Sequence, residues 1–184
     1  MATDSGESLT APYPTWGTFE KFLGGLNGTA IPSRIDGSLM KSLSGAAQSQ
    51  LRGALRFFRL VQGDQDAPTP KLRTLVAAHG TPEWKGVVAS LMTDYDELLD
   101  GLDRETATIS QLEDAFRTRG KVAGSALEKA VRFFLTVAET GGISVSPHWK
   151  SRNVTTSRAA GTRAPRAPKQ HRNNGEDLEA PAVG

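Results

Sequence analysis

Cysteine and long apolar stretches are both missing from this chain of 184 residues. Without cysteine there is no disulfide, no thiolate metal site and no cysteine nucleophile, which suits a reducing compartment. A transmembrane helix needs about 20 predominantly apolar residues in a row, and no such run occurs. Residues 1–11 are polar and acidic and lack the apolar segment of a signal peptide. We therefore expect a cytoplasmic protein with no membrane partner.

Histidine is scarce, and its placement matches no catalytic or metal-binding pattern. His79, His148 and His171 lie far apart, and no His and Glu pair has the spacing of a metal site. The glycine pairs Gly24-Gly25 and Gly141-Gly142 lack the Lys-Ser or Lys-Thr that follows in a phosphate-binding loop. We therefore expect no enzyme activity, no cofactor and no resident metal.

The formal net charge is only +2, but acidic and basic residues are segregated along the chain. Nine acidic residues lie between 83 and 114, and seven basic residues with no acid lie between 150 and 172. The acidic segment, with Asp94 and Glu97 on one helix face, can be interpreted as a metal cluster or as a solvated surface, and we favour the surface. The basic tail either attracts phosphates electrostatically or only keeps the terminus soluble. Its candidate nucleic-acid contacts are Arg158, Arg163 and Arg166.

Composition divides the chain into four segments. Residues 1–12 are predicted to be a disordered leader, and 151–184 a disordered basic tail containing proline and arginine. Between them we expect a first module over 13–80 and a second over 81–150.

An internal repeat relates these two modules. Residues 49–61 (SQLRGALRFFRLV) return as residues 125–137 (SALEKAVRFFLTV), with seven identical positions. Because a repeat of this length corresponds to a supersecondary unit, it predicts two related helical modules.

Apolar residues recur at helical spacing through most of residues 13–150. The spacing predicts helices over 15–26, 35–43, 47–61, 69–78, 83–99, 108–117 and 125–140. Helix starts are indicated by Thr69-Pro70, Thr81-Pro82, Thr108 and Ser125. Residues 62–68 predict a hairpin or wing, and residues 143–146 a short strand. The expected fold is mainly α, with two tandem helix-turn-helix or degenerate winged-helix-like modules and short wing or hairpin segments.

A basic stripe is predicted on the helix over 47–61. Its arginines recur at i, i+4 and i+7, opposite the apolar residues of the same helix. The second helix of a helix-turn-helix presents such side chains to the major groove and to phosphates. The competing interpretation is a solvent-exposed surface on which long side chains cover apolar neighbours. The candidate nucleic-acid-binding residues here are Gln48, Arg52, Arg56 and Arg59.

Each repeat carries adjacent phenylalanines, Phe57-Phe58 and Phe133-Phe134. Neighbouring residues cannot share one helix face, so Phe57 and Phe133 need a second partner. We expect contact between the two modules, with a homodimer or protein-partner surface as the alternative.

Several segments together resemble a small prokaryotic family catalogued only as a domain of unknown function. The resemblance lies in PTW (14–16), IPSRID (31–36), SGAAQSQL (44–51), PTP (68–70), VRFFL (131–135) and ISVSPH (143–148). It covers about residues 13–150 and implies a bacterial cytosolic protein. It brings no assigned catalytic residue.

The pattern as a whole favours a non-enzymatic binding module, with DNA or RNA as the leading partner. The alternative is a protein–protein adaptor or a structural, oligomerising protein on the same scaffold, because fold alone does not decide function.

Overall fold

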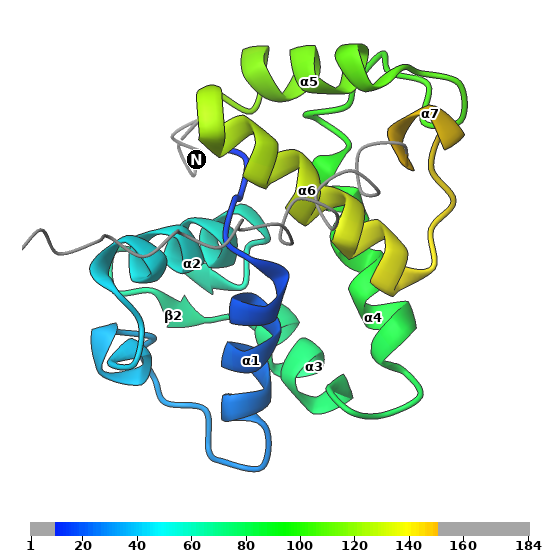
Figure 1. The fold of residues 1–184 in the computed structure, drawn as a ribbon. Coiled ribbons are helices and arrows are strands. Elements are labelled where there is room, and N and C mark those ends of the chain that lie inside the picture. The colour runs from blue at the N-terminus through cyan, green and yellow to red at the C-terminus, as the bar shows by residue number, and fades with distance from the viewer. Residues whose placement is uncertain (1–9, 151–184) are drawn as a thin grey trace, which may run out of the picture.

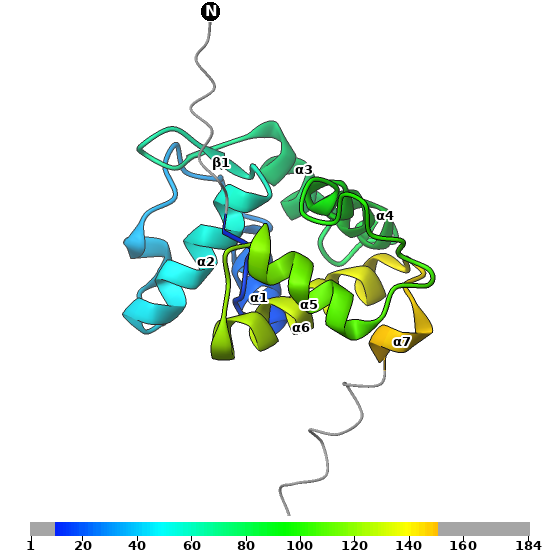
Figure 2. The same ribbon diagram turned by 90° about the horizontal axis from the view of Figure 1, so that it is seen from above.

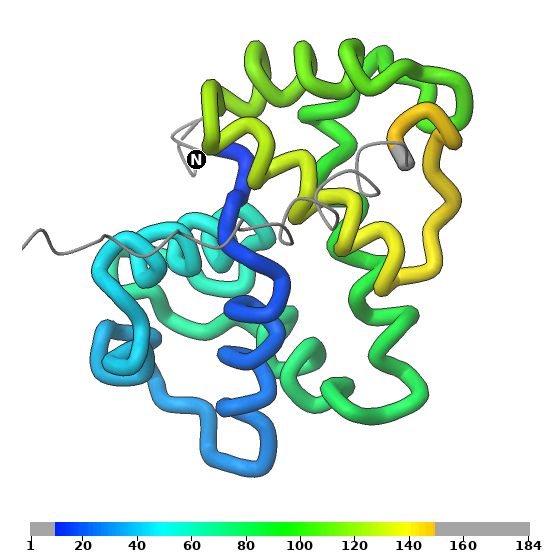
Figure 3. Tube along the Cα trace, in the orientation of Figure 1, coloured from blue at the N-terminus to red at the C-terminus, as the bar shows by residue number. Residues whose placement is uncertain are grey.

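The computed structural model describes residues 10–150 (Figure 1). The predicted tail, with Arg158, Arg163 and Arg166, lies outside the described residues, as do residues 1–9 of the predicted leader. The end of the leader differs from the prediction, because Ala11 and Pro12 are buried. Ala11 N–H donates to Gly120 O at 2.8 Å. Figure 3 follows this segment, in blue, from the turn before α6 into α1.

The described residues are mainly helical, as predicted. Figures 1 and 2 both show α2 and the hairpin on one side of the molecule and α4 and α7 on the other. The elements are α1 (Trp16–Leu26), the 3-10 helix η1 (Gly37–Met40), α2 (Gly45–Phe57), β1 (Val61–Gln62), β2 (Ala67–Pro68), α3 (Pro70–Ala78), α4 (Trp84–Ser90), the 3-10 helix η2 (Leu91–Tyr95), α5 (Ile109–Thr118), α6 (Gly124–Gly141) and α7 (Pro147–Lys150).

In the first half, a side-chain cap marks the start of α3, and one hairpin connects α2 to α3. Thr69 accepts a hydrogen bond from Leu72 N–H at the start of α3, as its position before proline predicts. Strands β1 and β2 pair antiparallel, which agrees with the hairpin predicted over 62–68. Ile35 N–H donates to Asp66 O at 3.0 Å, so the segment before η1 is bonded to the hairpin.

In the second half, α6 packs closely against α4. A Cβ at Gly141 would lie only 2.8 Å from Ala89 Cα and 2.9 Å from its N, so the two backbones approach without a side chain between them. Helix α5 starts after Thr108 as predicted, and Thr108 and Gln111 bond reciprocally in a capping box.

One hydrophobic core joins both halves. Phe58 lies 6.1 Å from Phe133, and Tyr95 lies 4.9 Å from both Phe57 and Phe134, measured between ring centroids. All four phenylalanines of the repeat are buried. The predicted packing of these rings is therefore present, and it joins the two halves of the chain.

The helix predicted over 47–61 ends at Phe57 instead, because the backbone turns left-handed two residues later. Arg59 has a φ of 53°, and Leu60 N–H donates to Leu55 O at 2.8 Å. Arg59 N–H also donates to Arg56 O, which completes a Schellman termination.

The helix predicted over 83–99 is also shorter than expected. Ser90 Oγ donates to Val87 O, and Thr93 Oγ1 donates to Ser90 O. Such side-chain bonds to carbonyls one turn back loosen the α-helical ladder. The chain continues from α4 as the tighter η2, while Leu91 and Tyr95 remain buried.

Four smaller predictions about local structure are wrong. Residues 35–43 form only η1, where Asp36 accepts from Ser38 N–H and tightens the turn. Residues 143–146 form no strand, since no neighbouring strand pairs with them. Thr81 does not cap α4, whose N-cap is Glu83. Ser125 does not cap α6, which begins one residue earlier, at Gly124.

Candidate nucleic-acid interface

Helix α2, which carries most of the predicted basic stripe, lies between η1 and the β1–β2 hairpin. Its solvent side is exposed at small residues and one arginine, namely Ala46, Ser49, Gly53 and Arg56. Gln48 and Arg52 are half-buried beside this strip. The helix backbone is therefore accessible from solvent, with the larger polar side chains along one edge.

Gln48 is engaged within the protein. Its Nε2 donates to Met40 O and to Leu43 O, each at 3.1 Å. These two bonds fix the turn between η1 and α2. Gln48 is therefore placed to position the helix, and its amide hydrogens already have acceptors.

Arg52 leans from α2 toward η1. Its Nη2 would lie 3.5 Å from a Cβ at Gly37, and its charge helps to lower the pKa of the Asp36 carboxyl, which is lowered mainly by hydrogen bonds from Ser38. Its Nε is buried and has no hydrogen-bond partner within residues 10–150.

Arg56 ties α2 to the hairpin. Its Nε donates to Asp66 Oδ1 at 2.8 Å, and the Asp66 side chain is only 9% exposed while that of Arg56 is 49% exposed. The ion pair holds the hairpin against the last turn of α2 and leaves much of the guanidinium in solvent.

Arg59 departs from the predicted stripe because it follows the end of α2 in the left-handed region. It is exposed, and its positive charge opposes the rise that burial causes in the pKa of the Asp94 carboxyl. Arg52 and Arg56 therefore share the helix, whereas Arg59 extends the basic surface from the turn beyond it.

Acidic side chains of the segment 83–114 form ion pairs with basic residues of the described chain. Asp94 pairs with Lys71 of α3, and Asp96 pairs with Arg104. Burial raises the pKa of the Asp94 carboxyl, against the opposing effect of Lys71. Within the described part of the chain, no group of three or more His, Asp or Glu side chains could hold a metal ion.

The two halves of the chain differ in net charge, although the formal total is only +2. Residues 13–80 hold eight Lys and Arg and four Asp and Glu, whereas residues 81–150 hold eight and eleven. The half that contains α2 and the hairpin is thus basic, and the other half is acidic.

Ser49 and Gln50 of this surface, and the buried Asp66 that pairs with Arg56, are absent from the set that the sequence predicts. The two polar side chains of α2 lie at i and i+1 on its accessible side, and helical spacing from Ala46 could have identified them. Asp66 lies ten residues from Arg56 across a turn, a relation that helical spacing does not capture.

Comparisons with protein-family models, curated proteins and solved structures give no match to this chain. None of the helices described between residues 10 and 150 combines the length and the hydropathy of a membrane-spanning segment.

Proposed function

We propose that the chain consists of two tandem helix-turn-helix or degenerate winged-helix-like modules, of which only the first has a wing-like hairpin within the described residues, and that this first module binds nucleic acid, with duplex DNA as the leading partner, through α2. The order α1, η1, α2 and hairpin is that of a helix-turn-helix followed by a wing. The observation that carries the proposal is the position of α2. It lies between η1 and the hairpin, accessible along its solvent side, in the basic half of the molecule.

The side chains of α2 suit two kinds of contact. Arg52, Arg56 and Arg59 would bind phosphates and set the register of the helix on the duplex. Ser49 and Gln50 would face base edges, where glutamine can pair with adenine. Gly53 has no atom within 4 Å of an added Cβ, which leaves room for close approach to a groove.

The proposal includes a cytoplasmic location and membership of the uncharacterised prokaryotic family that the sequence resembles. It assigns no catalytic residue. A second candidate function, protein–protein association, is favoured by a different feature of the fold, a groove beside α1.

A salt titration of binding to duplex DNA and duplex RNA tests the proposal on the full chain. We expect Arg52→Gln/Arg56→Gln/Arg59→Gln to weaken binding and to lower the slope of log K against log salt by about one unit for each phosphate that the variant no longer neutralises. The matched control is Arg117→Gln/Lys129→Gln/Arg132→Gln, which removes the same charge from exposed positions of the second half.

Two results would overturn this site. One is a folded α2 variant that binds duplexes like the wild type at matched salt. The other is equal loss of affinity in the control, which would assign binding to net charge alone. If binding is lost only on deletion of residues 151–184, the tail binds nucleic acid and the folded module does not.

A further inference from the structure

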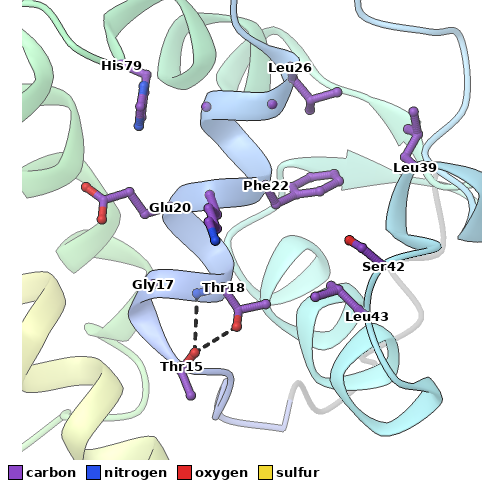
Figure 4. Close-up of a pocket in the computed structure, with 13 residues that line it drawn as sticks. Thr15, Gly17, Thr18, Glu20, Phe22, Leu26, Leu39, Ser42, Leu43 and His79 are labelled. Atoms are coloured by element: carbon purple, nitrogen blue, oxygen red, sulfur yellow. Dashed lines mark hydrogen bonds between the residues drawn. The ribbon is translucent and has the colours of Figure 1, made fainter.

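A groove of about 1000 Å³ runs along the solvent side of α1 (Figure 4). Figure 4 shows the Phe22 ring pointing from α1 toward the side that carries Leu39, Ser42 and Leu43. Glu20 and His79 lie on the other side. The groove thus has one mainly apolar wall and one polar wall.

Part of the floor of this groove is helix backbone at glycine residues. Gly17, Gly24 and Gly25 all line it, although each glycine inside a helix costs about 1 kcal/mol relative to alanine. An added Cβ at Gly17 or Gly25 would meet no atom within 4 Å. At these two positions the missing side chains leave space for another surface to approach α1, whereas a Cβ at Gly24 would lie 2.9 Å from His79 Cε1.

The same surface carries an exposed apolar side chain. Leu39, on the apolar wall, is 39% exposed, and it is the one large hydrophobic residue among the described residues that counts as exposed. An exposed apolar side chain beside a groove suits an isologous contact, because each copy can insert that side chain into the groove of the other.

The charges of the groove are also self-complementary. Glu20 and Lys21 are adjacent on α1, and both line the groove. In a two-fold arrangement each acid can face the base of the other copy. The tail residues 150–172 fit less well, because they are basic and would meet Lys21 with only Glu20 as an opposing charge.

We propose that this groove is the interface of a symmetric homodimer, in which Leu39 of each copy enters the groove of the other and Glu20 faces Lys21 of the second copy. Leu43 lines the groove and lies two residues before α2. The dimer would therefore relate two α2 helices by its two-fold axis, as the recognition helices of dimers that read paired half-sites are related.

Sedimentation velocity of the full chain without nucleic acid tests the dimer independently of the proposed function. We expect a dimer whose dissociation constant rises at least about tenfold in Glu20→Lys, in Lys21→Glu and in Leu39→Asp. Mixing Glu20→Lys with Lys21→Glu should restore association as a heterodimer, because every facing pair is again opposite in charge. The double variant Glu20→Lys/Lys21→Glu should restore the homodimer.

The adjacent, exposed residues Glu128 and Lys129 of α6 provide the matched control. Glu128→Lys and Lys129→Glu make the same charge changes outside the groove and should leave the dimer intact, while far-UV circular dichroism checks folding of every variant. A monomeric wild type, or a dimer unaffected by Leu39→Asp, would overturn the proposal. So would single swaps that are not rescued by mixing. A chain that dimerises only after removal of residues 151–184 would assign the groove to the tail.

Discussion

Helices α2 and α6 carry the two copies of the repeat, and the sides they turn to the core are almost interchangeable. Every aligned apolar pair of the repeat is buried in both copies, and all of these residues lie within the helices except Phe58 and Val61, which follow the end of α2. The pairs are Leu51 with Leu127, Ala54 with Ala130, Leu55 with Val131, Phe57 with Phe133, Phe58 with Phe134 and Val61 with Val137.

The two helices differ at positions that do not face the core. Arg52 of α2 aligns with Glu128 of α6, and the exposed Gly53 aligns with the exposed Lys129. Helix α2 ends four residues before the repeat does, whereas α6 continues past it to Gly141. Packing thus fixes the buried side of the repeat, while the solvent side has acquired a different charge in each half.

Removing one phenylalanine from each copy should have the largest effect and would test their equivalence. Phe58 and Phe134 are both fully buried. Phe58→Ala and Phe134→Ala should each lower the free energy of unfolding by about 3–5 kcal/mol, measured by chemical denaturation. Lys129→Ala, at an exposed position of α6 outside the groove, serves as the control and should cost much less. If the cost of one phenylalanine fell below about 1 kcal/mol, the two copies would not be packed alike.

This similarity is also the part of the fold that the sequence predicts best. Helical spacing identifies buried positions because burial on a helix follows its period. It identifies helix ends less well, because an end can be set by a single residue. Arg59 occupies the left-handed position where glycine is usual, so no glycine marks the end of α2 in the sequence.

Helical spacing also predicts only part of the candidate interface. Periodicity placed Arg52 and Arg56 together on α2. The roles of Gln48 and Arg56 depend on hydrogen bonds across turns, with Met40, Leu43 and Asp66. Such bonds are set by tertiary packing, which one sequence does not encode in any local pattern.

The aligned arginines of the two helices should differ in their contribution to stability. Arg56 pairs with the buried Asp66, whereas Arg132 is exposed on α6. Arg56→Gln should cost about 1–2 kcal/mol because it removes the charged partner of a buried carboxylate, although half of the Arg56 side chain is in solvent. Arg132→Gln should change the free energy of unfolding by less than about 0.5 kcal/mol. Equal effects in urea denaturation would show that the hairpin ion pair adds no stability.

The smallest effect concerns how the two helices end. Both close with the same pair of backbone bonds, through Arg59 after α2 and Gly142 after α6. Both residues are left-handed, with φ of 53° and 67°.

An L side chain is strained in this region and glycine is not, although glycine also gains freedom in the unfolded chain. Arg59→Gly should therefore raise the free energy of unfolding by about 0.5–1 kcal/mol. Arg59→Ala, which removes the same charge but keeps a Cβ, should give no such gain. If both variants were stabilised equally in thermal and urea unfolding, the gain would come from removing positive charge, and the left-handed turn would carry no strain.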